Sequence, residues 1–104
     1  MAEVMLSENL VRLLAELSPG RDVNEQVREL LRNEIVRRIN RYELLGRRFR
    51  QKYGMDLEAF RASGMVEQKG FSFEVESDYC DWEMAVTGVQ ALKEQLAALD
   101  SEDA

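Results

Sequence analysis

Residues 20–54 read GRDVNEQVRELLRNEIVRRINRYELLGRRFRQKYG, and apolar side chains recur throughout this stretch at every third or fourth position. The apolar positions are Val23, Val27, Leu30, Leu31, Ile35, Ile39, Tyr42, Leu45, Phe49 and Tyr53. This spacing predicts one amphipathic α-helix of about thirty residues. Asp22 can cap its start, with Glu25 three residues later as in a capping box, and Gly54 predicts its end.

A helix of thirty residues is about 45 Å long, which is more than so small a domain can cover by itself. Either the helix breaks near Gly46, or its apolar side packs against a second copy of the chain. We therefore expect a mainly α fold built as a long-helix homodimer, although a four-chain assembly fits the same pattern. The expected dimer core consists of Val27, Leu31, Ile35 and Ile39.

The segment before this helix predicts a shorter helix and permits a strand. Residues 2–6, AEVML, alternate in a way that a short N-terminal strand would. Ser7 can then cap a helix whose apolar positions share one face. These positions are Leu10, Leu13, Leu14 and Leu17. Pro19 and Gly20 predict the end of that helix.

The segment after Gly54 combines a short helix with a stretch of alternating residues. Asp56 begins the expected helix, and Gly64 ends it. Phe71, Phe73 and Val75 then alternate with polar residues, which is typical of a strand or an extended arm near 71–75. A single short strand is not stable alone, so it would need a partner. The alternative is a loop that lays these three apolar side chains on the helices.

The last segment begins SDYCDWEMAV at residue 77 and predicts a helix of some twenty residues. Ser77 can cap it, and Asp78 and Asp81 suit the positive end of a helix dipole. The apolar stripe of this helix is Tyr79, Trp82, Val86, Val89, Leu92, Leu96 and Leu99. Two interpretations of its aromatic start remain open: the side chains pack on the protein's own helices, or they contact a partner.

Charge is divided unevenly along the 104 residues, whose net charge is −6. Residues 1–54 hold 11 basic and 8 acidic residues, a net charge of +3, and ten of the basic residues are Arg. Residues 55–104 hold 3 basic and 12 acidic residues, a net charge of −9. We therefore predict a helical dimerisation region over 1–54 and an acidic helical arm that binds a partner over 55–104. The alternative is that the Arg-rich and acidic faces pair with each other.

The residues that usually carry chemistry are scarce in this sequence. There is no His, and the one Cys, Cys80, stands between Asp78 and Asp81, which disfavour a reactive thiolate. One Cys cannot build a zinc site, and the acids lack the spacing of a calcium loop. We expect no catalytic residues, no cofactor and no metal. The absence of a long apolar run or a basic leader predicts a cytoplasmic protein without a membrane span.

The run Gly20-Arg21-Asp22-Val23-Asn24-Glu25-Gln26-Val27-Arg28 resembles the start of the second helix in ribbon-helix-helix repressors. That resemblance implies an intertwined dimer whose paired N-terminal strands enter the major groove of DNA. Carried over to this chain, Val4 and Leu6 would face the core, and Glu3 and Met5 would face promoter DNA. Val23 and Asn24 would offer backbone N–H groups to phosphate.

The layout of the whole chain is similar to small prokaryotic antitoxins, with KYGMDLEAF and SDYCDWE following a regulator-like first half. That similarity implies a dimer that neutralises a basic toxin through an acidic arm and also binds its own promoter. The implied partner-binding residues are Phe71, Phe73, Val75, Tyr79, Trp82, Val86, Asp78 and Asp81. Two other functions stay open: a helical homodimeric scaffold or adaptor with no toxin and no DNA, and a DNA-binding regulator.

Overall fold

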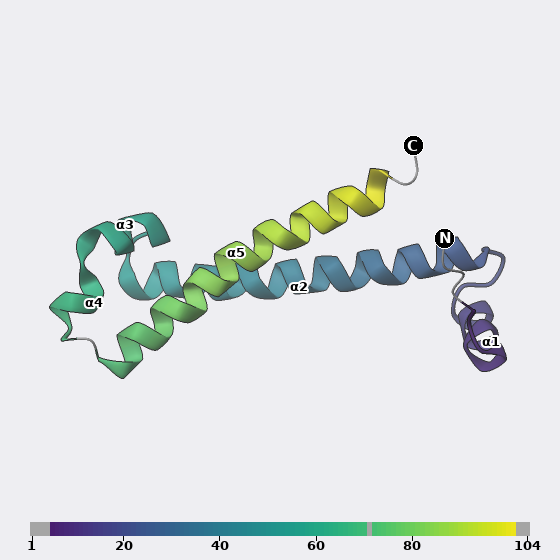
Figure 1. Ribbon diagram of the computed structural model, residues 1–104, viewed down its shortest axis with the longest axis horizontal. Helices are drawn as coiled ribbons and strands as arrows, with labels where there is room; N and C mark the ends of the chain where they lie inside the picture. The colour runs from purple at the N-terminus through teal and green to yellow at the C-terminus, as the bar shows by residue number, and fades with distance from the viewer. Residues whose placement is uncertain (1–4, 71, 102–104) are drawn as a thin grey trace. The chain divides into compact units, whose positions relative to one another are not determined.

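A computed structural model describes residues 5–70 and 72–101 and consists of helices joined by short turns (Figure 1). The elements are α1 (Glu8–Leu17), α2 (Val23–Tyr53), α3 (Leu57–Ser63), α4 (Met65–Gln68) and α5 (Phe73–Ser101). The prediction of a mainly α fold is confirmed. Glu3 and Val4 of the expected strand lie outside the described residues, and Met5 and Leu6 have no regular secondary structure.

The chain forms two compact units, an N-terminal unit of residues 1–34 and a C-terminal unit of residues 35–104. The boundary lies inside α2, whose second half groups with the C-terminal helices. The predicted division followed residue 54, at the end of α2. The difference arises because residues 35–53 of α2 pack against helices that come later in the chain, and periodicity within one helix does not report such contacts.

In the N-terminal unit, α1 and the start of α2 are joined by a turn with specific hydrogen bonds. Ser7 caps α1, its Oγ accepting from the N–H of Leu10 at 3.2 Å, as predicted. Gln26 of α2 is buried and donates from Nε2 to the carbonyl oxygens of Leu14 and Ser18, both at 2.9 Å. These carbonyls lie at the C-terminal end of α1, where Ser18 is the C-cap and the Leu14 carbonyl also accepts from the N–H of Ser18. One amide therefore ties the end of α1 to α2.

The α2 helix is continuous over its 31 residues. Asp22 caps it, with Oδ1 accepting from the N–H of Glu25 at 2.8 Å, and it ends before Gly54, whose φ is +69°. Both ends were predicted, because a capping carboxylate and a left-handed glycine act locally. Of the two interpretations of its length, the break near Gly46 is wrong, since α2 runs through this residue without interruption.

In the C-terminal unit, α5 runs antiparallel to the second half of α2 (Figure 1). Successive contacts follow the two helices in opposite directions: Lys52 with Asp78, Tyr42 with Gly88, and Glu43 with Lys93. At Gly88 a Cβ atom would lie 3.0 Å from Cε2 of Tyr42, which is closer than van der Waals contact allows. The missing side chain of Gly88 therefore lets the two helices approach closely.

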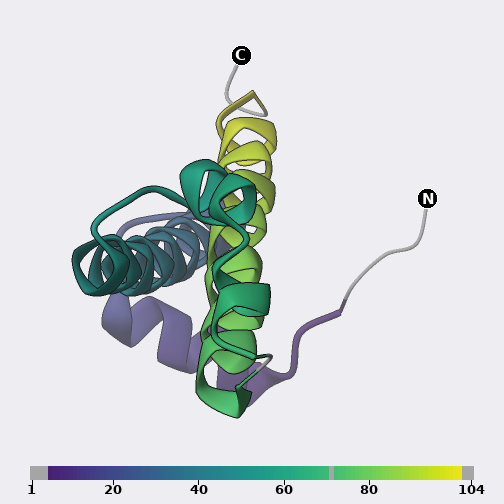
Figure 2. The ribbon, with the colours of Figure 1, turned by 90° about the vertical axis from the view of Figure 1, so that its left-hand side faces the viewer.

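The core of the C-terminal unit is aromatic and joins α2, α3 and α5. Its buried residues include Phe49, Leu57, Phe60, Val75 and Trp82. The Trp82 ring stacks on Phe49 with centroids 5.6 Å apart, and it lies 5.3 Å from Phe60. Figure 2 shows α4 beside the first turns of α5. Aromatic rings of α2 and α3 thus cover the tryptophan of α5, and its burial stabilises the packing of these three helices.

The expected extended segment near 71–75 is wrong for the residues that the structure describes. Helix α5 begins at Phe73, four residues before the predicted start at Ser77. Ser72 holds the first turn, with its Oγ accepting from the N–H of Val75 at 3.3 Å and its carbonyl from that of Glu76 at 3.0 Å. Residues 73 and 75 alternate with polar residues but are helical, because Ser72 caps the helix earlier and Val75 packs in the core. Phe71 lies outside the described residues.

Candidate partner-binding surfaces

The N-terminal unit leaves its apolar side chains uncovered. Among residues 5–34 no hydrophobic side chain is buried, and the only buried residue is Gln26. The leucine face of α1, which we define as Leu10, Leu13 and Leu17, is 50%, 40% and 74% exposed. Leu30 and Leu31 of α2 are also exposed. A helix pair that buries so little apolar area has little to stabilise it alone, so these side chains form a candidate interface.

The predicted dimer core is divided between the two units. Leu31 is exposed, while Val27 and Ile35 are partly buried. Ile39 is buried within the C-terminal unit, where α5 lies along this half of α2. An intramolecular helix covers Ile39 in this conformation, and the assignment of the four residues to a dimer core stays a prediction.

The predicted DNA contacts are exposed but lie beside a negative charge. Val23 and Asn24 form the exposed first turn of α2, and Met5 is exposed as well. The Asp22 carboxylate lies at the same helix end, where it already accepts from the N–H of Glu25. A carboxylate at that position opposes a phosphate. Glu3 lies outside the described residues, and DNA binding stays a prediction.

Two of the predicted partner contacts are core residues. Trp82 is 1% exposed and Val75 is 7% exposed, both within the core of the C-terminal unit. A buried side chain is not available to a partner in this conformation, and their assignment to a binding surface stays a prediction. The alternative interpretation, that the aromatic start of the helix packs on the protein's own helices, is confirmed for Trp82. Trp82 faces inward because α2 and α3 supply the matching aromatic rings.

Asp78 holds α2 and α5 together. Its Oδ2 accepts from Lys52 Nζ at 2.6 Å and from the Tyr53 hydroxyl at 2.5 Å, and Lys52 also pairs with Glu74 at 2.7 Å. Burial opposes ionisation of Asp78, but the hydrogen bonds from Lys52 and Tyr53 outweigh it and lower its pKa. The hydrogen bonds to Asp78 and Glu74 raise the pKa of Lys52. Asp78, predicted as a partner contact, therefore has an intramolecular role.

The pKa of the Tyr53 hydroxyl should lie above that of an ordinary phenol. Burial, followed by its hydrogen bond to Asp78, raises its pKa from 10.0 to about 12. A proton held more tightly in the folded state stabilises that state below pH 10, and this contribution is lost as the pH rises toward 12. Ultraviolet titration of phenolate, with Tyr53→Phe as the reference for the other tyrosines, measures this pKa. Asp78→Asn should lower it without restoring 10.0, because burial remains; an ordinary pKa in the folded wild type would contradict the contact.

The remaining predicted partner residues are accessible on α5. Phe73 is 86% exposed, and Asp81 and Val86 are exposed as well. Tyr79 is partly buried, and its hydroxyl accepts from Arg61 Nε at 3.0 Å. Of the eight predicted residues, these four and the partly buried Asp78 retain surface in the C-terminal unit.

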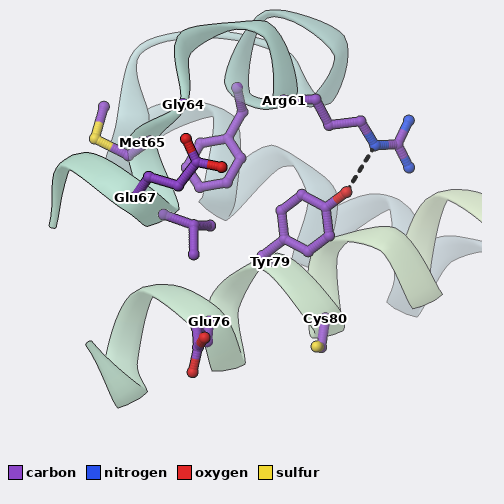
Figure 3. A pocket seen from close by; sticks show the side chains of 9 residues that line it. Arg61, Gly64, Met65, Glu67, Glu76, Tyr79 and Cys80 are labelled. Carbon is purple, nitrogen blue, oxygen red and sulfur yellow. Dashed lines mark hydrogen bonds between the residues drawn. The ribbon is translucent and has the colours of Figure 1, made fainter. Parts of the chain in front are cut away.

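A groove lies between α3, α4 and α5, with Tyr79 on one side (Figure 3). Its volume is about 650 Å³, and the aromatic and aliphatic side chains lining it are Phe60, Met65, Val66 and Tyr79. Arg61 lies at one end, and Glu67 and Glu76 line the groove from α4 and α5. The exposed thiol of Cys80 completes the lining.

Arg61 is already neutralised within the unit. Its guanidinium pairs with Glu58 at 2.7 Å and with Glu83 at 3.0 Å, besides donating to Tyr79. The hydrogen bonds to Tyr79 and Glu83 raise its pKa further. By contrast, no ion pair in the described part of the chain joins Glu67 or Glu76 to a cation. The groove therefore combines an apolar lining with uncompensated negative charge.

Five residues of the groove were not predicted as site residues: Arg61, Met65, Val66, Glu67 and Glu76. The four-residue helix α4 that carries three of them was not predicted. Its signal was the pair Gly64 and Gly70, both with positive φ, which bracket a stretch too short for a periodicity argument. A groove formed by segments that are distant in sequence has no local pattern that would reveal it.

Among residues 5–70 and 72–101, no three His, Cys, Asp or Glu side chains are grouped in a way that could hold a metal ion. Within the same ranges, no helix has the length and apolar character needed to cross a membrane. Comparison with family models, curated proteins and solved structures finds no match.

Proposed function

We propose that this chain is a non-enzymatic binding protein of the antitoxin type. It self-associates through the uncovered apolar side chains of its N-terminal unit and neutralises a basic partner on its acidic C-terminal unit. The observation that carries the proposal is the presence of these two different surfaces in one small chain. One is the leucine face of α1, and the other is the carboxylate-rich surface of α3 to α5.

Electrostatics supports a basic partner. Residues 55–104 carry 12 acidic and 3 basic residues, and Arg61 and Lys93 are both paired with acids. A strongly negative surface attracts a positively charged protein over a distance of about a Debye length and accelerates encounter. It repels nucleic acid. A nuclease with a basic active site is the kind of toxin that such a surface would block sterically.

Burial supports self-association. Covering a Leu that is half exposed contributes about 1 kcal/mol, half of what full burial of the side chain provides. In a two-fold symmetric dimer each such contact is made twice. A second copy of the chain is always available to cover this surface. The exposed leucines on α1 and α2 provide a self-complementary apolar surface for that copy.

The test is co-expression of the tagged chain with the product of its immediate neighbouring gene, followed by native mass measurement. The expected result is a complex of defined stoichiometry with a small basic protein that is toxic when expressed alone. Growth should be restored when this chain is expressed with it. A neighbour that is neither retained nor toxic would contradict the antitoxin function.

A second function is favoured by one observation. Trp82 and Val75, which were expected to hold a partner, belong to the protein's own core. A helical homodimeric scaffold or adaptor has no toxin partner and uses its aromatic residues in this way. The same experiment separates the two functions, because a scaffold would be recovered as a homo-oligomer without the neighbouring gene product. Promoter binding is compatible with the antitoxin function and would be recognised by its strong salt dependence.

A further inference from the structure

The groove between α4 and α5 has a chemistry that selects its occupant. Its lining of Phe60, Met65, Val66 and Tyr79 favours an apolar side chain, and methionine adapts its shape to different partners. Glu67 and Glu76 add negative charge from two different helices (Figure 3). These features together favour a ligand that is apolar at its centre and cationic on both sides.

The one cation in the groove does not offset this charge. The Arg61 guanidinium pairs with Glu58 and Glu83 and donates to the Tyr79 hydroxyl. These contacts neutralise the charge of Arg61 and orient its side chain along α5. Glu67 and Glu76 are exposed, and no described cation pairs with them. A ligand with phosphate or carboxylate groups would be repelled, whereas Arg or Lys side chains would find partners.

We propose that this groove binds a basic peptide segment of the partner protein, with one apolar side chain between α4 and α5 and cationic side chains on Glu67 and Glu76. The inference rests on the proposed function and names the surface that holds the partner. It replaces Trp82 and Val75, which are buried, with residues that a partner can reach. Tyr79 is the predicted partner residue that remains in the site.

The single cysteine allows the groove to be observed directly. Cys80 is exposed and lines the groove, so a small trifluoromethyl tag on its thiol reports occupancy by fluorine NMR. The probe is a helical peptide with one Phe flanked by Arg residues, added to the full chain. We expect a saturable shift of the fluorine resonance. Replacing the Phe of the peptide with Ala should weaken binding about tenfold, because the apolar contact is lost.

Removal of the two carboxylates is the decisive variant. Glu67→Gln with Glu76→Gln should weaken peptide binding about fivefold, since each exposed ion pair contributes modestly. The matched control is Glu16→Gln with Glu94→Gln, which removes the same charge from exposed positions elsewhere. Equal weakening by both pairs would overturn the proposal, because attraction would then depend on net charge alone. A fluorine shift that follows chain concentration without peptide would also overturn it, by showing that a second copy fills the groove.

The same variants separate this inference from the proposed function. Suppose that the wild-type chain and the variant Glu67→Gln with Glu76→Gln retain the neighbouring gene product equally well. The antitoxin function is then supported, and the proposal that the groove binds the partner is wrong. If the basic peptide binds as expected while no neighbouring product is retained, the groove stands and the antitoxin function is wrong. Circular dichroism of the variants should match the wild type, because both side chains are exposed.

Discussion

Trp82→Ala should destabilise the C-terminal unit by about 3–5 kcal/mol, the range found when large aromatic side chains are removed from cores. Trp82 is 1% exposed and contacts the rings of Phe49, Tyr53 and Phe60, so its loss leaves a cavity between α2, α3 and α5. For a domain of ordinary stability this is a large share of the total free energy of unfolding. Urea denaturation followed by circular dichroism measures the change.

Met84→Ala is the matched control for this experiment, since Met84 lies on the same helix and is half exposed. We expect it to change the free energy of unfolding by less than about 1 kcal/mol. An unfolding midpoint for Trp82→Ala equal to that of Met84→Ala would contradict the core position of the tryptophan. Loss of partner binding by Trp82→Ala would then reflect a direct contact.

Leu13→Glu with Leu17→Glu should prevent the proposed self-association through α1. Both side chains lie on the exposed leucine face of α1, where a charge is tolerated in the monomer but would be buried in the interface. Two substitutions per copy change four positions in a dimer, each contributing about 1 kcal/mol or more. We expect the dissociation constant to rise at least about 100-fold. Sedimentation equilibrium over a range of concentrations provides the measurement.

The control for added charge is Gln51→Glu with Gln95→Glu, which introduces the same two carboxylates at exposed positions of the C-terminal unit. This variant should keep the mass of the wild-type assembly. If Leu13→Glu with Leu17→Glu also keeps it, the leucine face does not mediate self-association. Retention of the basic partner by the dissociated variant would show that the C-terminal unit binds it without the dimer.

The sequence predicted the apolar stripe of α5, but it did not predict which way the stripe faces. The stripe that begins at Tyr79 and Trp82 was recognised, and both of its possible environments were stated. The direction in which the stripe faces depends on Phe49, Tyr53 and Phe60, which lie 22 to 33 residues away from Trp82 along the chain. The groove was missed for the same reason, because its lining comes from three helices.

The sequence by itself determined where α1, α2 and α3 begin and where α2 and α3 end. Ser7, Asp22 and Asp56 cap three of them through hydrogen bonds to a backbone N–H three residues on, and Gly54 and Gly64 end two of them with positive φ. These are interactions between near neighbours, and they have the same meaning in any fold. Only the tertiary structure decided that Trp82 and Ile39 are covered by the chain itself while the leucines of α1 are not. Burial depends on which helix lies alongside, and non-local packing sets that free energy.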